Sequence, residues 1–150
     1  MHVVPSVTAL ADLAGTDLGT TAWQVMDQSQ IDTFATLTGD RQWIHVDTER
    51  ASTGPFGTTI AHGMLTLSFV PLFIEAVVRV DNAGFGLNYG FERIRFTAPV
   101  RSGSRIRGAV RCVGTEAVTG GVRARFGVTV ELEGSARPAL VAEQAIVWLE

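Results

Sequence analysis

The feature that most constrains this chain is the segment Met64–Arg79, whose apolar side chains point in nearly every direction around a helix. A helix on a protein surface keeps one polar face, so a helix that is apolar nearly all round must be buried. Polar residues such as Glu75 interrupt the segment, which makes it too short and too polar to span a membrane. We therefore expect a central helix over 64–79, kinked at Pro71.

The rest of the chain supplies strands to cover this helix. From residue 85 onward the apolar residues recur with a period of two, which indicates strands. We predict strands over 85–96, 104–113, 122–132 and 138–149, with a hairpin turn at Thr119-Gly120-Gly121. This order predicts an α+β fold in which one antiparallel sheet packs on a helix. A sheet wrapped around a single apolar helix is the hotdog arrangement, and a generic α+β sandwich fits the pattern nearly as well.

Two smaller elements are expected before the central helix. Trp23 to Met26 is typical of a short strand. Asp27 and Gln30 have the spacing of a capping box, so a helix begins after Asp27, and Gly39 is placed to end it in the left-handed conformation. The first 20 residues carry only a weak pattern. We find no linker or repeat, and expect a single domain over residues 1–150.

Composition and charge exclude several classes of protein. With 46% hydrophobic residues and a net charge of −3, the chain is neither disordered nor suited to binding nucleic acid. Cys112 has no partner for a disulfide, and its place on a strand predicts a packed, buried thiol. The N-terminus lacks a secretory signal, so we expect a cytoplasmic protein with no membrane partner.

Two further observations concern partners. The slightly apolar mean hydropathy of +0.23 and a last strand expected to be unprotected suggest a homodimer. All 12 basic residues are arginine, and 10 of them follow residue 78. Such residues suit phosphates or carboxylates, or else line the outer face of the sheet. Candidates for contact with phosphates are Arg93, Arg95, Arg101, Arg105 and Arg107.

The residues that are candidates for catalysis or binding lie in the irregular segment 40–63. Asp40 and His45 are close enough in sequence to converge across a turn and hold a water molecule between a carboxylate and an imidazole. Alternatively, Asp40 caps a turn and His45 bonds to the backbone. Gly63 opens the central helix, where its N–H can donate to a carbonyl oxygen, or simply permits a tight turn. His62 is a second acid–base candidate or shapes that turn.

A metal site is a further alternative for this segment. Asp40, His45, Asp47 and His62 include two histidines and two carboxylates, but their spacing matches no standard ligand motif. We therefore expect no metal. Asp47 is equally placed to cap a short helical turn over 48–52.

Four segments together resemble the MaoC-like (R)-specific enoyl-CoA hydratases. They are LTGDRQWIHVD at 37–47, FGTTIAHGML at 56–65, NYG at 88–90 and IRFTAPV at 94–100. The resemblance implies a hotdog fold, usually a homodimer, and reversible syn hydration of a trans-2-enoyl-CoA without metal or organic cofactor.

The resemblance also assigns residues. It implies that Asp40 and His45 are the catalytic pair. Our hypothesis makes Asp40 the base and His45 the acid or the group that orients water, but the sequence leaves the order of these two roles open. The resemblance implies substrate-binding roles for Gly63, Gln42, His62 and Asn88. The chain departs from the family at 42–43, where Gln-Trp replaces the usual Asn-Pro. Without proline's fixed φ, this loop must be stiffened by packing of the Trp43 indole.

Three other functions remain open at this point. The same residues serve dehydration of a 3-hydroxyacyl group carried by acyl carrier protein. A hotdog acyl-CoA thioesterase also needs an activated water, but it attacks the carbonyl and releases a thiol. A non-catalytic acyl-CoA-binding protein would not need the Asp40/His45 pair.

Overall fold

The computed structural model describes residues 1–150 and places two helices and most strands where the sequence predicts them. The chain begins with β1 (His2–Val4), a 3₁₀ helix η1 (Thr8–Leu13), β2 (Asp17–Thr20) and β3 (Gln24–Met26). The helices α1 (Gln28–Thr38), α2 (Trp43–Val46), α3 (Thr48–Ser52) and α4 (Gly63–Val77) follow. The chain ends with β4 (Val78–Val80), β5 (Phe85–Phe96), β6 (Ser104–Val118), β7 (Gly121–Leu132) and β8 (Leu140–Leu149).

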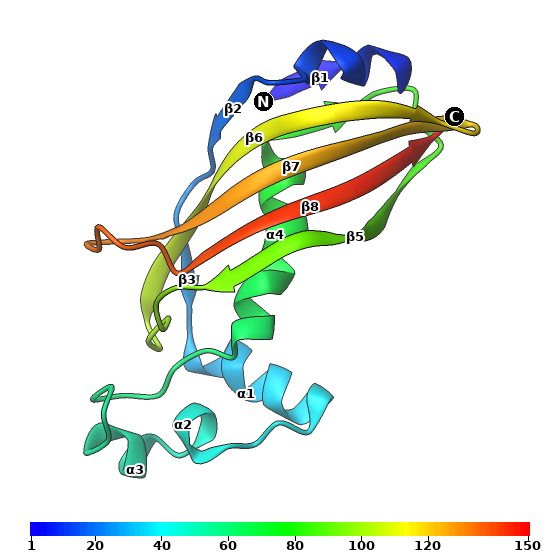
Figure 1. Cartoon of the computed structure of the whole chain (residues 1–150). Helices are drawn as coiled ribbons and strands as arrows, with labels where there is room; N and C mark the ends of the chain where they lie inside the picture. Colours follow the sequence, from blue (N-terminus) through cyan, green and yellow to red (C-terminus); the bar gives the residue numbers. More distant parts are fainter.

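One antiparallel sheet forms most of the molecule. Its strands are ordered β2-β6-β7-β8-β5, and β3 also pairs with β6. The long strands curve past α4, which runs along the inner face of the sheet (Figure 1). The fold is α+β, and this wrapping is the hotdog arrangement that the sequence predicts.

The core lies between α4 and the sheet. From the helix, Val70, Phe73 and Ile74 are at most 1% exposed, and from the sheet Phe126 and Leu140 are fully buried. Alternate residues of β7 from 122 to 130 face this core, as their period of two predicts. The residues between them are partly exposed, so the opposite face of β7 lies toward solvent. Cys112 also lies in the core, and burial raises the pKa of its thiol.

The central helix ends earlier than predicted. It stops at Val77, and Val78 to Val80 form β4. This short strand pairs in parallel with β1, from the N-terminal segment in which the sequence shows little pattern. The prediction was wrong here because β-branched residues favour a strand once a partner is available, and that partner lies more than 70 residues away in the chain. None of the helices is long and apolar enough to cross a membrane.

The prediction of an unprotected last strand was also wrong. β8 is paired on both sides, with β7 and with β5. One edge of the sheet is instead β5, which has only β8 as a neighbour, and β2 lies at the other edge. The large apolar side chains Phe85, Leu87, Tyr89 and Phe96 of β5 are all more than half exposed. An exposed apolar edge strand is a surface on which another chain can pair.

Many arginines line the outer face of the sheet, which is one of the two alternatives that the sequence leaves open. Four of them form ion pairs with glutamates on the same or adjacent strands or turns, at 2.6–2.8 Å: Arg105–Glu133, Arg107–Glu131, Arg123–Glu116 and Arg125–Glu143. The Arg123 side chain holds the pKa of the Glu116 carboxyl below its usual value by donating a hydrogen bond to it. Ion pairs with glutamates therefore hold these four arginine side chains on the outer face of the sheet.

The close approach of helix and sheet predicts that replacing Gly108 destabilises the fold. A Cβ added to Gly108 on β6 would lie 2.5 Å from the Cβ of Phe73, so alanine there forces α4 away from the sheet. Overpacking of this kind costs about 1–3 kcal/mol. We expect Gly108→Ala to lower the free energy of unfolding by that amount in urea titrations.

The matched control is Gly127→Ala on β7. A Cβ there would make an ordinary 3.4 Å contact with the Val113 side chain. Its stability should stay within about 0.5 kcal/mol of the original chain, as is usual for surface substitutions. Equal stabilities for the two variants would contradict the proposed contact between α4 and β6.

Candidate active site

The site lies at the end of α4 where the helix begins, next to the short helices α1, α2 and α3 (Figure 1). Local signals place the first residue. Asp27 and Gln30 form the predicted capping box, each side chain accepting from the other's backbone N–H at 2.9 Å. Gly39 ends α1 with φ of 79°, in the left-handed region. Asp40 therefore follows the helix directly, in a turn, with its side chain exposed.

His45 lies on α2, a single helical turn that the sequence does not predict, and it is 6% exposed. Its Nδ1 lies 2.7 Å from the carbonyl oxygen of Ile60. A carbonyl only accepts, so Nδ1 carries the proton, and in the neutral ring Nε2 is left as an acceptor. One of the two alternatives drawn from the sequence was that His45 bonds to the backbone. This holds for Nδ1, while Nε2 stays available for a reaction.

A side chain that the sequence analysis missed supports the same residue. Gln28 donates from Nε2 to the carbonyl oxygen of His45 at 2.8 Å and also contacts Thr59 through a hydrogen bond from the Thr59 hydroxyl. Gln28 therefore links the start of α1 to two parts of the irregular segment 40–63, at His45 near its beginning and at Thr59 near its end. A polar residue at the first position of a helix gives no sequence signal for such a role, because the contact depends on chain that lies far along the sequence.

His62 packs against both members of the Asp40/His45 pair. Its Nε2 donates to the backbone carbonyl oxygen of Asp40 at 2.9 Å. Its ring stacks on that of His45, with 3.8 Å between the centroids and 23° between the planes, and the ring of Phe34 lies 5.0 Å away. The side chain is 3% exposed, and its Nδ1 has no hydrogen-bond partner.

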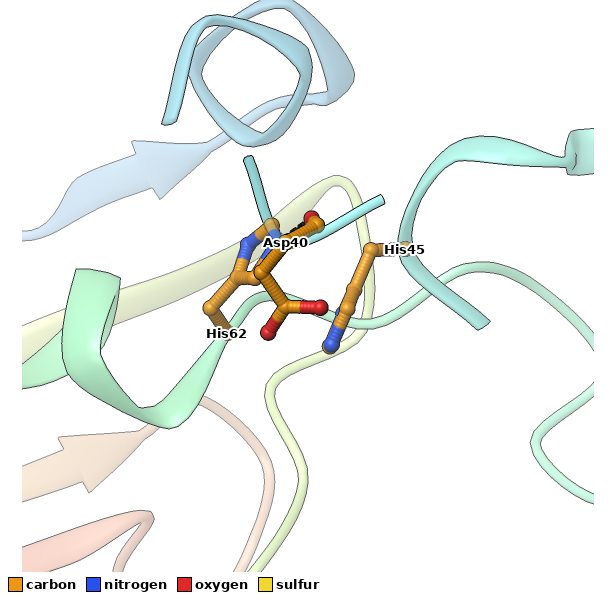
Figure 2. Close-up of side chains that lie close together, drawn as sticks. All are labelled: Asp40, His45 and His62. Atoms are coloured by element: carbon orange, nitrogen blue, oxygen red, sulfur yellow. Dashed lines mark hydrogen bonds between the residues drawn. The ribbon is translucent and has the colours of Figure 1, made fainter. Parts of the chain in front are cut away.

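The three side chains form one cluster. A carboxylate oxygen of Asp40 and one ring nitrogen from each of His45 and His62 all lie within 4.8 Å of one another. Figure 2 shows the carboxylate beside the edges of both imidazole rings. Asp40 and His45 make no direct hydrogen bond to each other. Two acceptors at this range can share one water, since atoms that each lie about 2.8 Å from the same water are roughly 4–5 Å apart.

The metal alternative loses one of its four residues. Asp47 turns away to cap α3, where its carboxylate accepts from the backbone N–H of Arg50 at 3.0 Å, as predicted. Of the remaining three, His45 and His62 each already direct one nitrogen to a carbonyl oxygen. That leaves three groups with no fourth protein ligand, and the absence of a resident metal stays a prediction.

Gly63 is the first residue of α4, as predicted, and its N–H donates to no acceptor within the chain. The N–H groups at the start of a helix carry partial positive charge and point away from it. A pocket of about 280 Å³ lies here, and its walls include His45, Gly63, Thr66 and Phe96. The Phe96 ring sits so close to Gly63 that an added Cβ would lie 3.0 Å from it. The sequence analysis assigned no role to Phe96.

The loop that carries the pair is stiffened as the sequence predicts. The guanidinium of Arg50 lies 4.3 Å from the centre of the Trp43 ring, and the same indole packs against Gly54, where a Cβ would lie 3.1 Å from it. Gln42 contributes through its backbone, whose N–H makes a long 3.5 Å contact to the Asp40 carboxylate. Its side chain bonds to no group in the chain.

Asn88 does not lie with the other predicted binding residues. It is on β5, exposed, and lines a different pocket, between β5, β8 and the second half of α4. The structure therefore brings together Asp40, His45, His62 and Gly63 and leaves Asn88 apart. The resemblance placed Asn88 by a short motif, which carries no information on where β5 lies relative to the loop.

Comparisons with known proteins give a consistent result. Residues 10–133 match the family model described as "MaoC like domain". The chain is 46% identical over 150 residues to the 3-hydroxyacyl-thioester dehydratase Z of Mycobacterium tuberculosis, with 99% of each chain covered. It is 36% identical over 91 residues to the (R)-specific enoyl-CoA hydratase of Rhodospirillum rubrum, which covers 61% of this chain and 60% of that one.

The fold comparison agrees with the sequence comparison. The unliganded R-hydratase PhaJ1 of Pseudomonas aeruginosa superimposes with a TM-score of 0.74 at 24% identity, covering 91% of this chain and 82% of that one. At this level of identity the likeness concerns the fold, which is the one that the sheet order and the central helix describe.

Proposed function

The chain belongs to the MaoC-like dehydratase family, and from that premise we propose that it is a hydro-lyase acting on acyl thioesters. The reaction is the reversible syn addition of water to a trans-2-enoyl thioester, which gives the (R)-3-hydroxyacyl thioester. Two observations carry this proposal together: Asp40 and His45 lie in one cluster, and His45 shares the pocket at the start of α4 with Gly63, whose N–H is unpaired.

The Asp40/His45 pair holds and activates the water. The Asp40 carboxylate and the Nε2 of neutral His45 are both acceptors, so one water donates a hydrogen to each. As the water oxygen attacks C3, one of these hydrogens passes to the pair and the other stays in the new hydroxyl. The pair then delivers its proton to C2. Because a single site takes and returns the proton, both additions occur on the same face of the double bond.

Gly63 stabilises the charge that this attack produces. Addition at C3 moves an electron pair toward the thioester carbonyl, whose oxygen becomes an enolate oxygen. The Gly63 N–H, at the positive end of a 15-residue helix, is free to donate to that oxygen. A preformed donor of this kind stabilises the transition state more than the ground state, which is the requirement for catalysis.

His62 acts through its neighbours and is a positioning residue. Its hydrogen bond fixes the Asp40 backbone, and its stacked ring fixes the plane of His45. It directs one nitrogen to a carbonyl, and the other is buried without a partner. This differs from the substrate-binding role that the resemblance implies.

The carrier of the thioester is either coenzyme A or acyl carrier protein, and the name of the Mycobacterium tuberculosis relative specifies a thioester only. Arg105 and Arg107 are paired with glutamates, which removes them from the candidates for phosphate contact. Arg93, Arg95 and Arg101 make no ion pair and remain available. We further propose a homodimer in which the exposed apolar edge of β5 is covered by a second copy.

The first test is the reaction itself. With crotonyl-CoA, we expect loss of the enoyl-thioester absorbance without release of free thiol. Asp40→Asn and His45→Ala should each lower turnover by at least about 10²-fold, because each removes an acid–base group. Thiol release would instead indicate a thioesterase. No signal with short or long enoyl chains would favour a carrier-protein substrate or a non-catalytic protein.

Asp47→Asn is the matched control for Asp40→Asn. It makes the same chemical change in the same loop, but at a carboxylate that caps α3, and asparagine is an equally good cap. We expect its turnover to stay close to that of the original chain. A loss as large as that of Asp40→Asn would assign the effect to the loop and not to the pair.

A pair of substitutions at Gly63 tests its N–H. Alanine keeps the N–H and brings a Cβ against the Phe96 ring. Proline removes the N–H and suits the first position of a helix, and the extended backbone of His62 (φ −59°, ψ 140°) allows a proline after it. Removing an oxyanion donor costs about 10²–10³ in rate. We expect kcat for Gly63→Pro to fall below that for Gly63→Ala by this factor.

Circular dichroism and thermal unfolding of both Gly63 variants would establish that α4 is retained. Equal kcat values for the folded alanine and proline variants would exclude the N–H from the mechanism and leave only the crowding of Phe96 as its effect.

Two substitutions separate the positioning role of His62 from simple packing. His62→Phe keeps an aromatic ring for stacking but loses the donor to the Asp40 carbonyl, while His62→Gln keeps a donor. We expect His62→Phe to lower kcat by about 10-fold or more with little change in KM, since misplacing a catalytic group acts on the chemical step. His62→Gln should restore part of that loss. Equal kcat values for the phenylalanine and glutamine variants would show that the hydrogen bond has no part in positioning.

A further inference from the structure

A second pocket lies further along α4, away from the Asp40/His45 pair. It has a volume of about 460 Å³ and is bounded by α4, β4, β5 and β8. Ile74 in its wall is about 16 Å along the helix axis from Gly63, at a rise of 1.5 Å per residue. The two pockets have no lining residue in common.

The wall of this pocket contains a polar side chain that the fold leaves unsatisfied. Gln144 on β8 is fully buried, and neither its Oε1 nor its Nε2 has a hydrogen-bond partner. A buried polar group without a partner destabilises the folded chain. The neighbouring positions Ala142 and Ile146 on the same face of β8 are apolar, so an apolar residue at 144 would fit the core pattern.

The remaining walls define what can enter. Ile74, Val78 and Ile146 are apolar. The Trp148 indole lies over Gly86, so close that a Cβ added to Gly86 would be 3.1 Å from the indole Nε1. A largely hydrocarbon group therefore fits, with one function that meets the Gln144 amide.

The charges at the pocket select against an anion. Glu75 lines the pocket and forms no ion pair. Arg79 also lines it, but its side chain is bonded to Asp81 at 2.8 Å. A carboxylate in the pocket would therefore face an unpaired glutamate without a free cation beside it. A neutral oxygen function avoids this repulsion and can still pair with the amide of Gln144, as donor, as acceptor, or as both.

Under the proposed function this pocket takes the distal part of the substrate's acyl chain, and we propose that Gln144 selects chains that carry a neutral oxygen function, a hydroxyl or a ketone, in that part. The identification of the ligand as an acyl chain rests on the proposed function. The pocket and its buried amide do not depend on it. A site built to hydrogen-bond such a group discriminates strongly against the analogue that lacks it, because its own buried polar atoms are then left unpaired.

The test uses saturated acyl-CoA thioesters of eight to sixteen carbons, which cannot be hydrated, so binding is measured without turnover. At each length the chain ends in a methyl, a hydroxyl or a carboxylate group, and isothermal titration gives Kd. We expect the hydroxyl-ended chain to bind at least about 10-fold more tightly than the methyl-ended chain at the length that reaches Gln144, and the carboxylate-ended chain to bind least tightly.

Gln144→Met is the matched variant, since methionine has a similar length and no amide. It should remove the preference for the hydroxyl-ended chain, leaving less than about a 2-fold difference. The side-chain amide signals of Gln144 in the nuclear magnetic resonance spectrum, assigned by their loss in this variant, should shift when the hydroxyl-ended chain binds. They provide the readout in the original chain if the variant does not fold.

Absence of a preference at every length, or a preference that persists in Gln144→Met, would overturn the proposal and indicate that water or a second copy satisfies the amide. If no CoA thioester binds at all, coenzyme A is excluded as the carrier, which leaves acyl carrier protein or a non-catalytic protein. The pocket is then tested alone with 1-hexanol, and unmoved Gln144 amide signals would overturn the pocket proposal as well.

Discussion

The burial of one side of α4 against the sheet is the constraint on which the rest of the structure depends. Eight of its residues are buried and the sheet curves around them, while Ser68, Leu72 and Glu75 lie on a stripe that stays exposed, so the expectation of a helix buried nearly all round was wrong. The first turn is also exposed, at Gly63 and Met64. The beginning carries backbone N–H groups that no residue of the chain caps. The exposed first turn therefore leaves a positive, unpaired terminus facing a pocket, which is where a developing negative charge is best stabilised.

The cluster of Asp40, His45 and His62 is held by backbone carbonyls more than by other side chains. His45 and His62 donate to the carbonyl oxygens of Ile60 and Asp40, which lie at opposite ends of the loop. Each bond closes that loop and also fixes which ring nitrogen holds the proton. An irregular segment can position acid–base groups accurately when such bonds and the packing of Trp43 replace regular secondary structure.

Much of the fold and of the candidate site could be predicted from signals between neighbouring residues. The features that could not be predicted depend on pairing between distant parts of the chain. Asp27 and Gly39 define α1 because capping depends on a few adjacent residues. The early end of α4 and the inner position of β8 were missed because they depend on partners distant in the chain. Asp40, His45 and Gly63 could be found from the sequence. The contact of His62 with the Asp40 carbonyl could not, since 22 residues separate them.

Gln144 is a polar residue at a core position of β8, and its place in the strand pattern can be recognised from the sequence. Along β8 the residues 140, 142, 144 and 146 share the inner face, and only Gln144 among them is polar. In a strand that packs against an apolar helix, such an exception reduces stability unless a partner arrives from outside the chain. The same reasoning applies to the unpaired Gly63 N–H. Both groups line pockets along one helix, and in both proposals a ligand supplies the missing hydrogen bond.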